Sequence, residues 1–107
     1  MVNTQFDYLY RDACNYKKSQ SVILRGTMSE NDMHAIMEKL DDGTFIAEQV
    51  GLPVERFEKW TIDDHPFVEF VSIENTESAP TLEMSAAELA DNFRKVDYWD
   101  SLAYPGC

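Results

Sequence analysis

The chain has 107 residues, of which 44% are hydrophobic, as expected for one folded domain with a single core. Nine basic residues stand against twenty acidic ones, and the resulting net charge of −11 disfavours direct binding to nucleic-acid phosphates. No apolar run approaches the about 20 residues that span a bilayer, and no signal-peptide pattern opens the sequence. We therefore expect a cytoplasmic protein that does not bind membranes.

The acidic charge is unevenly distributed along the chain. Residues 1–26 hold four basic and two acidic residues, so the remainder carries −13 from eighteen acids and five bases. A surface of this kind attracts basic proteins through long-range forces that weaken as the salt concentration rises. The same composition is also typical of an ordinary solubilising surface.

A strand at residues 5–11 is the first element that the pattern predicts. Phe6, Tyr8 and Tyr10 fall on one face of it, in the period-two alternation of a half-buried strand. A polar loop follows, and then a short apolar run predicts a second strand at 21–26. We expect the two strands to form a hairpin.

The same stretch carries a resemblance to a known group of proteins. The run Tyr8-Leu9-Tyr10-Arg11-Asp12-Ala13, followed after one residue by Asn15-Tyr16-Lys17, resembles the opening of a group of small bacterial and prophage proteins without established activity. Gly51-Leu52-Pro53 lies where such proteins carry a similar tripeptide, whereas Cys14 stands where they tend to have Gly. The resemblance implies a fold and a mobile-element setting, but no reaction.

Two helices are predicted, each after a capping serine. Ser29 precedes a helix at 30–41, in which apolar residues recur at helical spacing. Ser85 opens a capping box before a second helix at 85–97, whose expected core stripe is Leu89, Ala90, Phe93 and Val96. On the outer flank of the first helix, four-residue steps separate Glu30, His34 and Glu38.

Two further strands are expected, at 44–48 and 66–73, and the latter is apolar enough on both faces for a central place in the sheet. The sequence thus predicts a single α+β domain. Its about four strands form a mostly antiparallel sheet with two helices on one face, in the order β-β-α-β-β-α. Residues 98–107 form an acidic, aromatic C-terminal tail that either closes over the core or anchors a partner.

Residues 46–60 look like a helix-turn-helix motif, with Gly51 at the turn. A DNA-reading helix needs basic side chains, but here two glutamates offset Arg56 and Lys59. We therefore favour a strand leading into a short helix at 53–60, and keep a DNA-binding regulator as an alternative.

Metal-binding and catalytic chemistry are both disfavoured. Asp63, Asp64 and His65, joined by Glu69, are the densest group of possible metal ligands, but neighbours on an extended loop point apart. The four glycines are isolated, so there is no phosphate-binding loop, and no nucleophile, base and orienting acid occur at a recognisable spacing. We expect no enzyme activity, no metal and no cofactor, and two free thiols.

The functional expectation is a non-enzymatic acidic protein that occupies a basic, nucleic-acid-binding surface of a partner protein. Together with the resemblance to prophage proteins, this expectation indicates an anti-defence inhibitor of the anti-CRISPR kind. The carboxylates expected to stand in for phosphates are Asp63, Asp64, Glu74, Glu77, Glu83, Glu88 and Asp91. A bacterial adaptor domain whose acidity serves only solubility is a further alternative.

Overall fold

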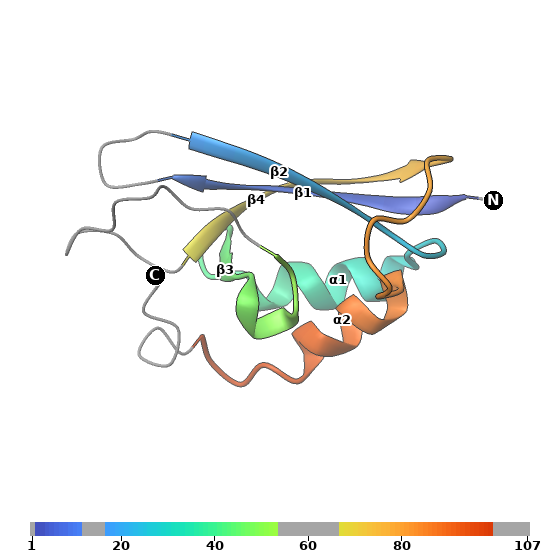
Figure 1. Cartoon of the computed structure of the whole chain (residues 1–107). Coiled ribbons are helices and arrows are strands. Elements are labelled where there is room, and N and C mark those ends of the chain that lie inside the picture. The colour runs from blue at the N-terminus through green and yellow to red at the C-terminus, as the bar shows by residue number, and fades with distance from the viewer. Residues whose placement is uncertain (1, 12–16, 54–66, 100–107) are drawn as a thin grey trace.

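The computed structural model describes residues 2–11, 17–53 and 67–99. In these ranges the chain forms a four-stranded sheet and two α-helices (Figure 1). The elements in order are β1 (Asn3–Arg11), β2 (Lys17–Leu24), α1 (Glu30–Lys39), β3 (Thr44–Ile46), the 3-10 helix η1 (Glu48–Val50), β4 (Phe67–Thr76) and α2 (Ala86–Arg94). The predicted α+β class is confirmed, and the observed order follows the predicted β-β-α-β-β-α.

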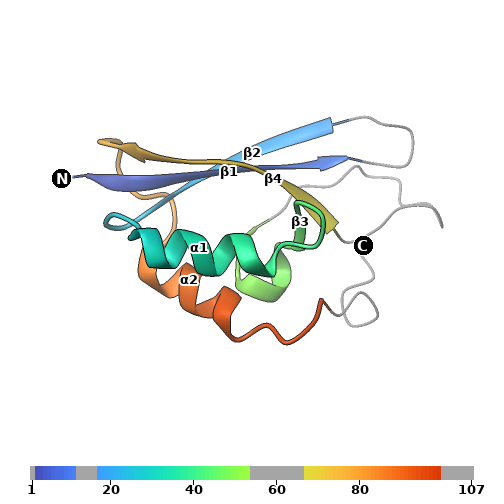
Figure 2. The same cartoon turned by 180° about the vertical axis from the view of Figure 1, so that it is seen from behind.

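The sheet is antiparallel throughout, with the strand order β2-β1-β4-β3. Both helices lie on one of its faces, and no described element covers the other face (Figures 1 and 2). α2 lies nearer to the β2 edge of the sheet. At its start, the Ala86 amide donates to the carbonyl oxygen of Arg25, the residue after β2. α1 lies on the side of β4 (Figure 2).

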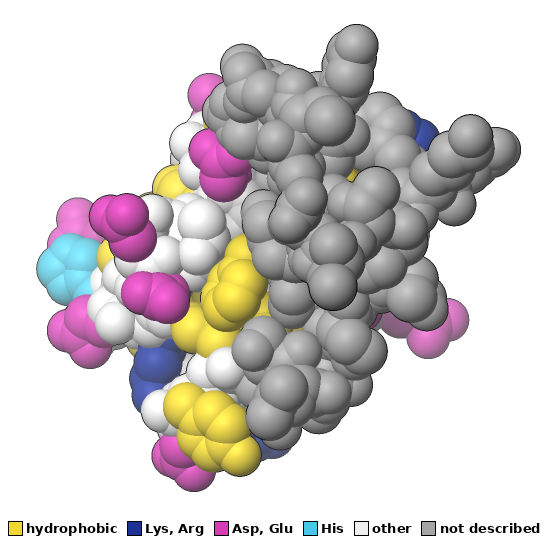
Figure 3. Space-filling model, turned by 90° about the vertical axis from the view of Figure 1, so that its left-hand side faces the viewer, with side chains coloured by type: hydrophobic (Ala, Val, Ile, Leu, Met, Phe, Trp, Pro, Cys, Tyr) yellow, Lys and Arg dark blue, Asp and Glu magenta, His cyan; other side chains and the backbone are white. Residues whose placement is uncertain are grey.

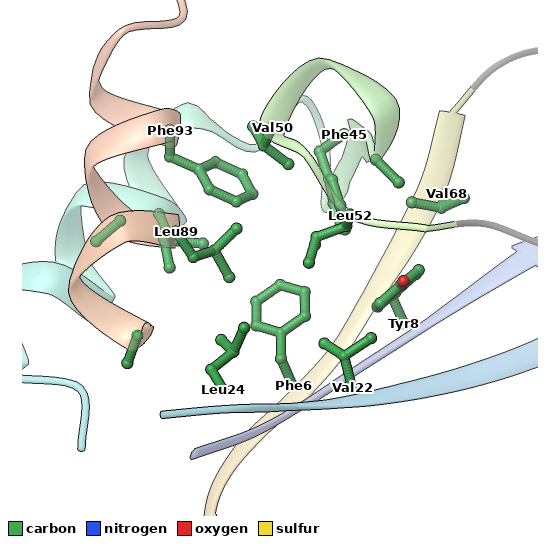
Figure 4. Close-up of a cluster of buried hydrophobic side chains, with 14 of the residues drawn as sticks. Phe6, Tyr8, Val22, Leu24, Phe45, Val50, Leu52, Val68, Leu89 and Phe93 are labelled. Atoms are coloured by element: carbon green, nitrogen blue, oxygen red, sulfur yellow. The ribbon is translucent and has the colours of Figure 1, made fainter. Parts of the chain in front are cut away.

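The hydrophobic core fills the space between the sheet and the helices (Figure 4). Phe6, Tyr8 and Tyr10, the predicted inner face of β1, are each at most 1% exposed. The rings of Phe45 and Phe93 lie 5.5 Å apart between centroids and join β3 to α2. The expected stripe of the second helix is buried throughout: Leu89, Ala90, Phe93 and Val96.

The bounds of the long strands differ from the prediction. β2 begins at Lys17 because every residue from Lys17 to Leu24 pairs with β1. This pairing extends the strand through polar residues that the hydrophobic pattern did not predict. β2 ends at Leu24, since Gly26 has a φ of 79° that no strand adopts. β4 continues to Thr76, which pairs with Asn3 at the start of β1.

The ends of the helices and of β3 also differ from the prediction. α1 ends at Lys39, and Asp42 and Gly43, with φ of 52° and 81°, turn the chain into β3. α2 ends at Arg94, so Val96 is buried as part of the following turn. β3 ends at residue 46, and η1 then occupies part of the segment that resembles a helix-turn-helix motif. The predicted short helix at 53–60 falls almost entirely outside the described residues.

Of the two described residues of the C-terminal tail, Trp99 packs against the core and Tyr98 is exposed. Trp99 lies against the rings of Phe45 and Phe93, and its Nε1–H donates to the Lys39 carbonyl oxygen at 2.7 Å. Tyr98 is 69% exposed. Residues 100–107 lie outside the described ranges. None of the helices in the described part of the chain is both long and apolar enough to cross a membrane.

Candidate partner-binding surface

The contacts of α1 fix which of its flanks faces α2. The Asp32 carboxylate accepts a hydrogen bond of 2.6 Å from the Arg94 guanidinium at the end of α2. The Lys39 ammonium donates to the carbonyl oxygen of Val96. Asp32 and Lys39 are seven residues apart and therefore lie on the same side of the helix. The opposite flank of α1 consequently faces away from α2.

Four carboxylates on that outer flank and in the turn after it form what we call the acidic strip: Glu30, Glu38, Asp41 and Asp42. All four are exposed, and none makes an ion pair with another described residue. Three of them, Glu38, Asp41 and Asp42, lie near the C-terminal end of α1, where the helix dipole adds further negative potential. In Figure 3, viewed from the side on which α1 ends, acidic side chains gather on the left of the molecule.

Two of the predicted partner-binding carboxylates have basic neighbours within the chain. Glu88 lies 3.4 Å from the guanidinium of Arg25, in an exposed ion pair. Asp91 lies 2.8 Å from Arg94, one turn along α2. Hydrogen bonds to Asp32 and then to Asp91 raise the pKa of Arg94. These intramolecular cations partly neutralise the exposed face of α2.

The other predicted carboxylates are spread over different parts of the molecule. Glu83 lies beside Glu88, since the Arg25 guanidinium that pairs with Glu88 also donates to the Glu83 carbonyl oxygen. The side chain of Glu83 is exposed. Glu74 lies on β4 opposite Gln5, and Glu77 follows the end of that strand. The structure therefore groups Glu83 with the acids of α2 and keeps Glu74 and Glu77 on β4 and just beyond it. Asp63 and Asp64 lie outside the described residues.

Asp7 is a partly buried carboxylate on the open face of the sheet, and its contacts there are structural. Asp7, on β1, accepts hydrogen bonds from Ser21 on β2, from Ser72 on β4 and from Gln5. Partial burial would raise the pKa of Asp7, but the hydrogen bonds from Ser21, Ser72 and Gln5 outweigh it and lower the pKa below its ordinary value. Asp7 thus ties three strands together, and its oxygens are already occupied.

The described residues offer no assembled metal site, since no group of three or more His, Cys, Asp or Glu among them has a suitable arrangement. The possible ligands at 63–65 fall outside those ranges. In the sequence, Glu30 and Glu38 of the acidic strip form a four-residue repeat with His34, but this pattern alone did not predict a binding surface. The sequence also did not show that Arg25 and Arg94 would partly neutralise the charge of α2. The chain matches no protein-family model, no curated protein and no solved structure.

Proposed function

We propose that this chain is a non-enzymatic binding protein whose acidic strip docks onto a basic surface of a partner protein. The observation that carries the proposal is the contrast between the acidic strip and the exposed carboxylates of α2. The carboxylates of the acidic strip are exposed and have no ion-pair partner among the described residues, whereas Glu88 and Asp91 on α2 each have an arginine neighbour. Unpaired carboxylates retain their full attraction for Arg and Lys on another molecule.

The partner surface that fits best is one that otherwise binds nucleic acid. Glu30 and Glu38 are two helical turns apart, about 12 Å along the axis of α1, with His34 between them, and Asp41 and Asp42 continue the strip beyond the helix end. A row of carboxylates can occupy lysines and arginines that would otherwise hold phosphates. The concrete form of the proposal is an inhibitor of a bacterial nuclease, of the anti-CRISPR kind.

Two charge-matched variants test this proposal. The strip variant combines Glu30→Gln, Glu38→Gln, Asp41→Asn and Asp42→Asn. The matched control carries the same change of charge on α2 and in the segments next to it: Glu83→Gln, Glu88→Gln, Asp91→Asn and Asp97→Asn. The tagged proteins are used to capture partners from bacterial lysate at low and high salt, and mass spectrometry identifies what is retained.

We expect the wild-type chain and the control to retain a nucleic-acid-binding protein at low salt, and the strip variant to lose it. Added duplex DNA should compete with the chain for this partner, because both occupy the same basic surface. The chain alone should not retard duplex DNA in a gel. Retention that is indifferent to salt and to the strip variant would contradict the proposal, and loss in the control alone would assign binding to the carboxylates of α2.

A further inference from the structure

One edge of β4 has no described strand beside it over most of its length. β3 pairs with β4 only at Phe67, Val68 and Glu69, and the Phe70 amide then donates to the Gly43 carbonyl oxygen. From Val71 to Thr76, the described chain gives β4 backbone partners on β1 only. We call this segment the β4 free edge. It is six residues long, about 20 Å, and a strand of that length can bind another extended chain.

The flank of α1 that faces away from α2 carries two methionines as well as the glutamates of the acidic strip. Met33 and Met37 lie one turn apart on that flank, and α1 lies on the β4 side of the sheet (Figure 2). Met37 is 39% exposed, while Met33 packs partly against the core. We call this pair the methionine flank. Methionine side chains adapt to different apolar partners, so they suit a binding surface.

The register of β4 shows where the side chains of an added strand would point. Ile73 lies opposite buried Phe6 and so faces the helices, whereas Glu74 is exposed opposite Gln5 on the open face. Residues directly opposite one another on neighbouring strands share a face of the sheet. A strand added to the β4 free edge would therefore place alternate side chains toward the methionine flank and beside Glu74.

We propose that the β4 free edge and the methionine flank bind an extended, basic segment of the partner protein by strand addition. The inference rests on the proposed function and specifies how the partner binds. Main-chain hydrogen bonds to β4 would hold the segment, apolar side chains would cover Met37 on the helix-covered face, and Lys or Arg would lie beside Glu74 on the open face.

Charge argues for this occupant over a second copy of the chain. Two copies paired through the β4 free edge would bring together two strands that each carry Glu74, in molecules of net charge −11. A basic strand would not meet this repulsion.

Peptides of about nine residues with alternating Lys and Val serve as the probe, because they are long enough to cover the six-residue edge and they alternate between its two faces. Binding to the full chain is measured by fluorescence anisotropy at low salt. Two further peptides carry N-methyl groups on the amides of either the Lys or the Val residues, so that each blocks one hydrogen-bonding edge. The chain is also tested as Met37→Gln and as the control Tyr98→Gln, which replaces an exposed aromatic residue beyond α2.

We expect one methylated peptide to bind like the parent peptide and the other to bind at least about tenfold more weakly. Met37→Gln should weaken the parent peptide about threefold to tenfold, and Tyr98→Gln should leave it unchanged. In NMR hydrogen exchange, alternate amides between Val71 and Thr76 should become protected when the peptide binds.

Each other outcome overturns the inference in a distinguishable way. Equal binding of both methylated peptides, with spectral changes confined to the acidic strip, would leave the proposed function standing and exclude strand addition. Absence of binding by every basic peptide at low salt would overturn strand addition, whereas capture of the partner by the strip variant and its control decides the proposed function separately. Protection of the β4 amides in the free chain that rises with protein concentration would identify a second copy as the occupant.

Discussion

At the scale of single residues, the open face of the sheet is held by one carboxylate. Asp7 lies on the central strand and accepts hydrogen bonds from side chains on both neighbouring strands, including one of 2.9 Å from Ser72. Hydrogen bonds to a charged acceptor are stronger than neutral ones, and these fix the relative positions of β2, β1 and β4. These hydrogen bonds therefore cross-link three strands on the face that no described element covers.

Replacing Asp7 with Asn should lower stability by about 1 kcal/mol at pH 7, because the charged acceptor is lost at a partly exposed site. The pKa of Asp7 is lowered in the folded state, so its contribution is present above the ordinary value of 3.8 and disappears as the pH falls through the folded pKa. Urea unfolding of both proteins at pH 7 and at about pH 2.5 measures this. The stability difference should shrink at the lower pH.

Asp97→Asn is the control for this measurement, since Asp97 is exposed and makes no interaction with other described residues. Its effect should stay within about 0.5 kcal/mol at both pH values. A difference between wild type and Asp7→Asn that persists unchanged at low pH would mean that the carboxylate charge does not stabilise the sheet.

At the scale of elements, the sequence predicted best what depends on local signals. The second helix combines a capping serine with an apolar stripe, and both are found: Ser85 accepts from the Glu88 amide, and the stripe is buried. The polar half of β2 and the end of β4 were missed because their pairing with β1, not their own composition, makes them strands. The ion pair between Arg25 and Glu88 was missed for the same reason, because the two residues are far apart in the sequence.

The cap of α2 gives a prediction at this scale. Ser85→Ala should lower the free energy of unfolding by about 1 kcal/mol, because the Glu88 amide would lose its acceptor, and Ser85→Asp should retain most of the stability. Chemical denaturation of the three proteins measures the effect. The control is Ser19→Ala, which removes an exposed hydroxyl on β2 and should change little. Equal losses in Ser85→Ala and Ser85→Asp would show that the side-chain cap contributes nothing.

At the scale of the whole molecule, the net charge of −11 opposes folding. The described part of the chain offsets some of it through contacts between elements, as when Arg94 joins Asp32 on α1 to Asp91 on α2. The acidic strip has no such compensation among the described residues, and most of it lies at the end of α1 where negative charge is least favourable. The strip should therefore destabilise the free protein.

Substitutions in the strip should thus separate stability from binding. Glu38→Gln with Asp41→Asn should stabilise the free chain by about 0.3–1 kcal/mol at low salt, because both carboxylates oppose the dipole of α1. The gain should fall as NaCl screens the charges, which thermal or urea unfolding at several salt concentrations will show. The same double variant should bind the partner captured by the wild-type chain more weakly. A variant that is more stable and binds equally well would assign these carboxylates to solubility alone.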